Sequence, residues 1–325
     1  TLGKLNAQKD NVIWIFHALT ANSNPAEWWP GLVGEGKFFD PDRYFIICAN
    51  KPGSPYGSIS PLSIQPETGE PYYENFPVFS IRDMVQCYSR LKEHLGITHI
   101  HAGIGGSTGG MQVLEWAIEE PSLFTHIIPI ATNAVLSPWG IAFNASQRMA
   151  IEADSSWLER RPDAGQKGLA AARSIALLSY RHYNGYGITQ PREKAFMPLT
   201  GNIQYASDNY QRYQGMKLVN RFHAMCYYRL TQSMDSHDTG RGRGSVQAAL
   251  QRISAKTLVI GIESDVLYPI EEQVFLKENI KGASLLRIAS DFGHDGFLLE
   301  YEKIEQSLRQ FMDEKPVQHL KVVNQ

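Results

Sequence analysis

The chain has few of the features that mark a disulfide-rich or metal-bound protein. Its 325 residues include only three cysteines, Cys48, Cys87 and Cys226. They are odd in number, lie far apart and never form a CxxC pair, so the sequence indicates neither a disulfide framework nor a structural zinc site. We expect free thiols, no metal and a cytoplasmic protein.

An excess of positive charge is also missing. Lys and Arg total 31 and Asp and Glu total 33, which gives a net charge of −2. Without a basic field, neither nucleic acid nor an anionic membrane is an expected partner. No apolar run is long enough to span a bilayer, and no signal peptide is recognisable. With 43% hydrophobic residues, the chain has the composition of a globular protein with a large core.

Short apolar runs rich in β-branched residues recur along the sequence. Between several of them lie helical patterns, such as residues 81–95 and 108–119. Strands that alternate with helices predict an α/β fold with a mostly parallel central sheet and helices on both faces. The runs expected to form strands buried on both faces are residues 11–16, 44–49, 99–104, 125–131, 257–262 and 284–289.

The alternation stops between residues 136 and 245, where strand-like runs vanish. Helical patterns replace them at residues 141–154, 168–181 and 210–234. We expect residues 136–245 to be an all-helical lid inserted into the α/β core, which then consists of residues 1–135 and 246–325. The lid would cover the carboxyl edge of the sheet, where open parallel sheets bind their ligands.

Ser107 lies at the centre of a GxSxG pattern formed by Gly105, Gly106, Ser107, Thr108 and Gly109. The pattern follows a strand-like run and precedes a helical one, as in the strand-to-helix turn that exposes a nucleophilic serine above a sheet. Such a turn needs small neighbours, because the serine backbone is strained and added Cβ atoms would clash with the chain passing nearby. Ser107 is therefore the candidate nucleophile.

Two other interpretations of the glycine-rich turn were weighed. Gly103 and Gly105 begin a dinucleotide-like GxGxx pattern, but Thr108 occupies the third glycine position and residues 125–131 contain no acidic residue for a ribose. A phosphate loop would need Gly-Lys-Ser or Gly-Lys-Thr, which does not follow. A turn that only allows close backbone approach remains the plain structural alternative.

A serine hydroxyl needs a base and an acid that orients the base, in the chain order serine, acid, histidine. Asp265 follows the strand expected at residues 257–262, and His294 follows the strand expected at residues 284–289. Both would lie at the same sheet edge as Ser107. The sequence thus predicts a Ser107, Asp265 and His294 triad.

Other histidines fit this role less well. His237 precedes an aspartate but lies at the exit of the helical insertion. His99 and His101 share one face of a strand, yet no third ligand is spaced with them. We expect these two to be core or surface residues.

Acyl transfer also needs hydrogen-bond donors for the developing oxyanion, and loss of one donor costs about 3 kcal/mol of barrier. One donor should be the backbone amide of Thr108, which follows the nucleophile at a helix start. The other should come from the loop after the first strand, from Leu19 or its neighbour. A plain strand-to-helix turn is the alternative for that loop.

Six segments together resemble the homoserine O-acetyltransferase family of the α/β-hydrolase superfamily, and they cover nearly the whole chain. The pair FSIRDMV and GGSxGGMQxLEWA is far more specific than GxSxG alone. The segments are HALTANS at 17–23, NKPGSPYGSISP at 50–61, FSIRDMVQ at 79–86, GGSTGGMQVLEWA at 105–117, ESDVLYP at 263–269 and GHDGFL at 293–298.

The resemblance implies a ping-pong acyltransferase of methionine biosynthesis. In this scheme acetyl-CoA, a co-substrate rather than a permanently bound cofactor, acylates Ser107, and the γ-hydroxyl of L-homoserine then accepts the acetyl group. His294 would act as base and then acid, oriented by Asp265. The resemblance also suggests a homodimer formed through the helical lid.

By position in the family pattern, Arg173 and Tyr180 match the contacts to the carboxylate of the amino acid, and Asp295 matches the contact to its ammonium group. Each has a structural alternative: an ion pair for Arg173, helix packing for Tyr180 and a helix cap for Asp295. Thr108 departs from the family pattern, which usually has methionine or leucine there, and this alters the wall near the acyl group.

Several functions stay open at this point. A succinyl donor, an L-serine acceptor or a plain serine esterase would use the same triad, and a silent binding protein would share the fold. Silent relatives tend to lose a triad member, whereas all three stand here in the expected order.

Overall fold

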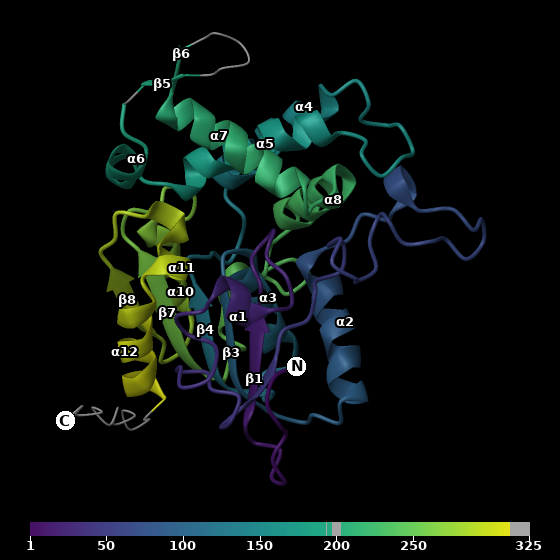
Figure 1. The fold of residues 1–325 in the computed structure, drawn as a ribbon. Helices are drawn as coiled ribbons and strands as arrows, with labels where there is room; N and C mark the ends of the chain where they lie inside the picture. The colour runs from purple at the N-terminus through teal and green to yellow at the C-terminus, as the bar shows by residue number, and fades with distance from the viewer. Residues whose placement is uncertain (193, 197–202, 313–325) are drawn as a thin grey trace, which may run out of the picture.

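Six parallel strands form the central sheet in the computed structural model, which describes residues 1–192, 194–196 and 203–312. The strand order is β2-β1-β3-β4-β7-β8. Since all six strands run in the same direction, their carboxyl ends meet at one edge (Figure 1). All six predicted strands are confirmed: β1 (Val12–Phe16), β2 (Phe45–Ile47), β3 (Ile100–Gly106), β4 (Phe124–Ile130), β7 (Lys256–Ile262) and β8 (Ser284–Ile288).

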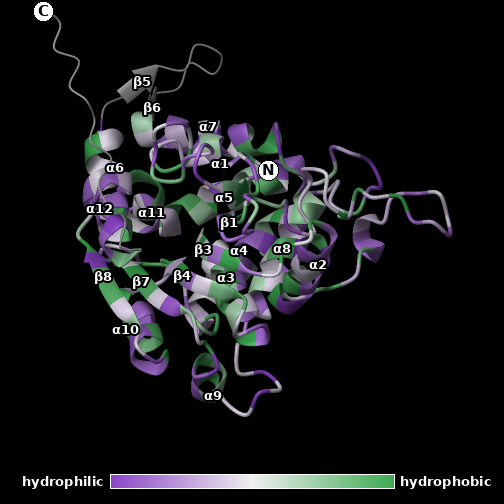
Figure 2. Ribbon diagram, turned by 90° about the horizontal axis from the view of Figure 1, so that it is seen from below, coloured by the Kyte–Doolittle hydropathy of each residue, from purple (hydrophilic) through white to green (hydrophobic). Residues whose placement is uncertain are grey.

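The sheet separates two hydrophobic cores, and alternate residues of β1 face each of them. Trp14 belongs to the core that includes side chains of α2 (Ile81–His94) and α3 (Thr108–Glu119), whereas Ile15 belongs to the core that includes side chains of α12 (Tyr301–Phe311). This burial on both faces explains why the strands are continuous apolar runs. Figure 2 shows hydrophilic residues on α12 at the outer margin of the sheet.

Shorter elements complete the core of the fold. They are α1 (Pro25–Trp28), η1 (Tyr73–Asn75), α9 (Val246–Leu250), α10 (Ile270–Asn279), η2 (Gly293–Asp295) and α11 (Gly296–Leu299).

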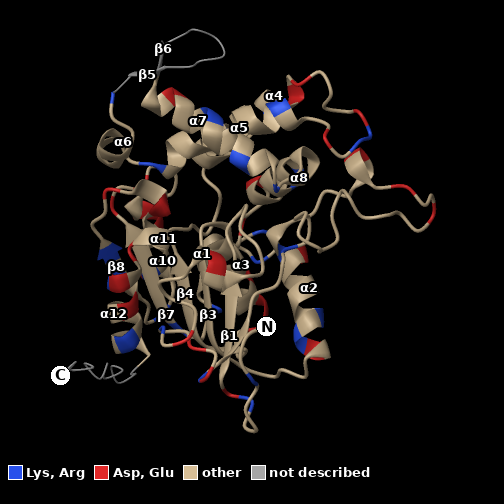
Figure 3. Ribbon diagram, in the orientation of Figure 1, with Lys and Arg blue, Asp and Glu red and all other residues tan. Residues whose placement is uncertain are grey.

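None of the helices in the described ranges is both long and apolar enough to cross a membrane. Acidic and basic residues are interspersed along the outer helices (Figure 3).

A helical layer lies above the carboxyl edge of the sheet (Figure 1). Within it, α5 packs against both α4 and α7, and α4 packs against α8. We use the name helical layer for α4 (Pro138–Glu152), α5 (Gln166–Tyr180), α6 (Tyr183–Thr189), α7 (Ala206–Val219) and α8 (Ala224–Asp235). These helices stand where residues 136–245 were expected to form a lid.

The helical pattern at residues 210–234 is confirmed, but it is divided between two helices and the expectation of an all-helical segment was wrong. Helix α7 ends at Val219, and His223 caps the start of α8 by accepting a hydrogen bond from the Met225 amide at 3.1 Å. The segment is also not purely helical, since β5 (Lys194–Phe196) and β6 (Ile203–Tyr205) form an antiparallel pair. Strands of three residues are too short to show an alternating pattern.

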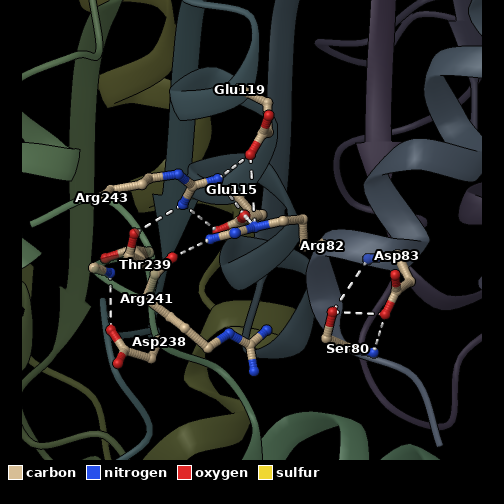
Figure 4. Close-up of polar contacts among 10 residues, drawn as sticks. Ser80, Arg82, Asp83, Glu115, Glu119, Asp238, Thr239, Arg241 and Arg243 are labelled. Carbon is tan, nitrogen blue, oxygen red and sulfur yellow. Dashed lines mark hydrogen bonds and ion pairs between the residues drawn. The ribbon is translucent and has the colours of Figure 1, made fainter.

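A buried ion-pair network fastens α3 to its surroundings (Figure 4). Glu115 of α3 accepts hydrogen bonds from Arg82 Nε at 2.6 Å and from Arg243 Nη2 at 2.5 Å. Arg243 also pairs with Glu119, and Arg82 donates to the carbonyl of Arg241 at 3.0 Å. The network joins α2, α3 and the segment that returns from the helical layer.

The two arginines decide the charge state of Glu115. Burial alone would raise the pKa of this carboxyl, but the hydrogen bonds from Arg243 and Arg82 outweigh burial and lower the pKa below its ordinary value. Glu115 is therefore a carboxylate whose stability in the core depends on its partners.

Candidate active site

Ser107 lies in the turn between β3 and α3 in a strained backbone conformation, with φ 58° and ψ −125°. Such a conformation costs about 1–3 kcal/mol in a residue with a side chain. The surroundings hold it in place, because the Ser107 amide donates to the carbonyl of Ile130 at 2.9 Å and its carbonyl accepts from the hydroxyl of Thr132 at 2.9 Å. The strand-to-helix turn expected from the sequence is present.

The glycines around Ser107 are required by close backbone contacts. A Cβ atom on Gly109 would lie 2.1 Å from the carbonyl oxygen of Phe16, at the end of β1. A Cβ atom on Gly105 would lie 2.6 Å from the carbonyl carbon of Gly109. Side chains at these two positions would push the first turn of α3 away from the sheet, so the tight turn depends on both.

Asp265 and His294 form a buried pair. The Nδ1 atom of His294 lies 2.6 Å from Oδ2 of Asp265, and both residues are less than 5% exposed. The other carboxylate oxygen accepts from the amides of Leu267 at 2.8 Å and Tyr268 at 3.0 Å. With Nδ1 donating to the carboxylate, the imidazole keeps Nε2 as its acceptor atom. This is the tautomer that a general base needs.

Three aromatic rings surround the imidazole of His294. Their centroids lie 5.7 Å away for Tyr180, 5.2 Å for Tyr268 and 5.3 Å for Phe297. Tyr180 was expected at the site, whereas Tyr268 and Phe297 were not, although each lies three residues from a member of the candidate triad. Burial raises the pKa of the Tyr268 hydroxyl well above its ordinary value, so this ring is neutral.

Most of the candidate residues line one cavity of about 490 Å³. Ser107 and His294 both contribute to it, so the candidate nucleophile and the candidate base face a common space. Asp265 reaches the cavity through His294, and Thr108 begins the helix behind Ser107. The other predicted residues in the lining are Leu19, Arg173, Tyr180 and Asp295, and the sequence analysis did not name Glu27, Trp28, Tyr56, Lys217 and Arg221.

Arg173 contributes a guanidinium group to the cavity from α5. Its guanidinium carbon lies 5.5 Å from the centre of the Tyr180 ring, which is cation–π geometry. Within residues 1–192, 194–196 and 203–312, no carboxylate forms an ion pair with Arg173. The alternative of a structural ion pair therefore finds no support there.

Asp295 lines the cavity next to His294, and its carboxylate pairs with Arg181. The sequence analysis did not anticipate this partner. Asp295 precedes α11, but its side chain makes no capping hydrogen bond to that helix. The helix-cap alternative is thus not what the structure has, because the Asp295 side chain contacts Arg181 instead.

The two residues expected to supply the oxyanion donors come from separate segments of the chain. Leu19 lines the cavity after β1, and Thr108 is the first residue of α3. The first amides of a helix have no partner inside the helix and carry the positive end of its dipole. The hydroxyl of Thr108 also accepts a hydrogen bond from Lys51 Nζ at 3.0 Å, a contact that the sequence analysis missed.

The rival histidines are occupied elsewhere. His237 is buried, and its Nε2 lies 3.0 Å from the carbonyl of Asn133. His99 Nε2 lies 2.6 Å from the hydroxyl of Thr125. Among the residues described, no three His, Cys, Asp or Glu side chains gather as a metal site would require.

Comparisons with known proteins identify the fold and the family. A family model for the alpha/beta hydrolase fold matches residues 11–301. The chain is 48% identical over 313 residues to a homoserine O-acetyltransferase from Cyclobacterium marinum, which covers 96% of this chain and 87% of the relative. The fold is similar to the crystal structure of homoserine O-acetyltransferase from Bacillus anthracis, with a TM-score of 0.86, 26% identity, and coverage of 97% and 91% of the two chains. It is equally similar to esterase E22, with a TM-score of 0.86, 26% identity, and coverage of 96% and 92%.

Proposed function

The chain belongs to the homoserine O-acetyltransferase family of the α/β-hydrolase fold, and we propose that it transfers an acetyl group from acetyl-CoA to the γ-hydroxyl of L-homoserine through acyl-Ser107. Its substrates are small molecules of amino-acid biosynthesis, and acetyl-CoA is a co-substrate rather than a bound cofactor. The observation that carries the proposed mechanism is the cavity shared by Ser107 and His294, with Asp265 bonded to the far side of the imidazole.

The first half-reaction acylates the serine. His294 takes the proton of the Ser107 hydroxyl on Nε2 while the oxygen attacks the thioester carbonyl. The amides of Thr108 and Leu19 stabilise the oxyanion that forms. The carbon–sulfur bond then breaks, and CoA leaves as a thiol with the proton from His294.

The second half-reaction reverses these roles with the acceptor. His294 takes the proton of the γ-hydroxyl of L-homoserine while that oxygen attacks the acyl-Ser107 carbonyl. O-acetylhomoserine departs and Ser107 regains its proton. Transfer prevails over hydrolysis when the acceptor is held in attack geometry and water is kept away, which the helical layer above the sheet edge favours.

Two charged side chains in the cavity suit an amino acid. Arg173 offers a guanidinium group to the carboxylate, and Tyr180 stacks beside it. Asp295 offers its carboxylate to the ammonium group, next to the catalytic histidine. This pair of opposite charges supports an amino-acid acceptor over an uncharged alcohol.

The function is tested by measuring CoA release from acetyl-CoA with and without L-homoserine. We expect one rapid turnover without homoserine and steady turnover with it. Steady release that is indifferent to homoserine would favour an esterase like the structural neighbour E22 and would reject transferase activity. Parallel rates with succinyl-CoA and with L-serine separate the remaining donor and acceptor alternatives.

Substitution of Arg173 tests the acceptor site. We expect Arg173→Met to raise the KM for L-homoserine about tenfold to hundredfold, since a hydrogen bond to a charged group contributes about 1.5–3 kcal/mol. Acylation by acetyl-CoA should stay near the wild-type rate. The control is Arg212→Met, which removes an exposed arginine of α7 that pairs with Asp208. A KM equal to that of the control would show that Arg173 does not bind L-homoserine.

We also propose a homodimer formed through the helical layer. Several large apolar side chains of α5 and α6 are exposed there, including Leu178 at 60%, Tyr183 at 89% and Ile188 at 74%. They surround a surface recess of about 1030 Å³ between α5, α6 and α7. Apolar clusters of this kind are typical of protein interfaces.

A single charge in this patch should weaken the dimer. We expect Tyr183→Asp to shift sedimentation toward the monomer at micromolar concentration, because an unpaired carboxylate is costly in an apolar interface. Val78→Asp is the control, since Val78 is 67% exposed and precedes α2, outside the helical layer. A variant that sediments like this control would place the interface elsewhere.

A further inference from the structure

Lys51 is a buried lysine behind the oxyanion hole. It follows β2, its side chain is 1% exposed, and Nζ donates to the hydroxyl of Thr108 at 3.0 Å. In the part of the chain that the structure describes, no carboxylate pairs with it. Lysine is rarely fully buried without a charged partner. Packing alone therefore does not explain why a lysine occupies this position.

The backbone of Lys51 reaches the other side of the oxyanion hole. Its amide donates to Nε2 of His17 at 3.0 Å, so the proton of that ring resides on Nδ1, which lies 2.9 Å from the carbonyl of Ala18. Ala18 directly precedes Leu19, the second expected oxyanion donor. One residue thus contacts both segments that supply oxyanion amides.

We propose that Lys51 is a positioning residue for the oxyanion hole, which joins Thr108 to the His17–Leu19 segment and places a positive charge behind the developing oxyanion. This inference rests on the proposed acylation of Ser107. The side chain acts through the hydroxyl of Thr108 and the backbone acts through the ring of His17.

Lys51 is the group that carries charge in its cluster with Cys48 and His17, because those two neighbours are neutral. Burial lowers the pKa of the Lys51 ammonium to about 7. Burial raises the pKa of the Cys48 thiol to about 12, so that thiol is neutral. Burial and then the charge of Lys51 lower the pKa of His17 well below its ordinary value, so that ring is neutral too.

The charge state of Lys51 should affect the pH dependence of Ser107 acylation. A protonated Lys51 stabilises the oxyanion, and an uncharged Lys51 does not. The rate of Ser107 acylation should therefore carry a limb that descends as pH rises through about 7. A lysine with a purely structural role would leave no such limb.

The experiment measures single-turnover acylation by acetyl-CoA with intact-protein mass spectrometry, from about pH 6 to about pH 9. We expect Lys51→Met to slow acylation on the order of tenfold at the acid end and to lack the descending limb. Lys303→Met is the control, because Lys303 is exposed and pairs with Glu300. Thr108→Val, which keeps the backbone amide and removes the hydroxyl, should slow acylation several-fold.

Each outcome decides between distinct claims. A folded Lys51→Met enzyme with wild-type rates and an unchanged pH profile would overturn the inference. Should that variant fail to fold, a Thr108→Val enzyme that acylates at the wild-type rate, or a wild-type profile without a descending limb, would overturn it as well. A wild-type protein that acquires no acetyl group would instead reject the proposed function itself.

Discussion

Replacing Ser107 by alanine should abolish the covalent acetyl adduct and lower turnover by about 10⁴-fold or more. The hydroxyl is the atom that accepts the acyl group, and loss of a triad nucleophile removes nearly all of the rate that the triad supplies. The measurement is intact-protein mass spectrometry after brief exposure to acetyl-CoA, together with CoA release in the presence of L-homoserine. Folding should be retained, because the Ser107 backbone contacts to Ile130 and Thr132 do not involve its hydroxyl.

A matched serine distinguishes this effect from general damage. Ser233 of α8 is fully buried, and its hydroxyl has no hydrogen-bond partner among the residues that the structure describes. Ser233→Ala should leave the adduct and the turnover near wild-type levels. A Ser107→Ala protein that still accumulates one acetyl group per chain would show that another residue is the nucleophile.

Arg243→Met should destabilise the fold by about 3–5 kcal/mol, the usual result of leaving one charge of a buried pair without its partner. Glu115 would keep Arg82 but lose the two hydrogen bonds from Arg243. The measurement is the free energy of unfolding in urea, and the control is Arg90→Met, which removes an 85% exposed arginine paired with Glu93. The control should change stability by less than about 1 kcal/mol.

The wild type and Arg243→Met should also differ in how their free energy of unfolding depends on pH. The folded pKa of Glu115 lies below its unfolded value, so this group stabilises the wild type above the unfolded pKa. That contribution is lost as pH falls through the folded pKa. Without Arg243 the pKa of Glu115 should rise, so the stability gap between the two proteins should narrow in acid. A gap that stays constant with pH would contradict the assigned role of Arg243.

The strands were predictable because each is a run of residues buried on both faces, bounded by turns. Helix α3 matches its predicted range of residues 108–119, since the elbow glycines fix its start. The helical layer was less predictable. The break between α7 and α8 depends on the side chain of His223 acting as a cap, and an apolar periodicity contains no information about that hydrogen bond.

The candidate triad was predictable for a topological reason. Ser107, Asp265 and His294 each follow a strand of a parallel sheet, so their backbones reach the same edge whatever the loops do. Contacts between loop side chains were not predictable in this way. Lys51 meets Thr108 from a separate loop, and Arg181 reaches Asp295 from the helical layer. Such pairs depend on side-chain direction across segments distant in sequence.

The separation of Ser107 from His294 along the chain has a consequence for biosynthesis of the protein. The proposed nucleophile directly follows β3, whereas the imidazole of the proposed base follows β8, the last strand of the sheet. A growing polypeptide on the ribosome therefore contains a serine without its proposed general base until the segment after β8 has emerged and folded onto the rest. Under the proposed mechanism, products truncated ahead of β8 should therefore be inert toward acetyl donors.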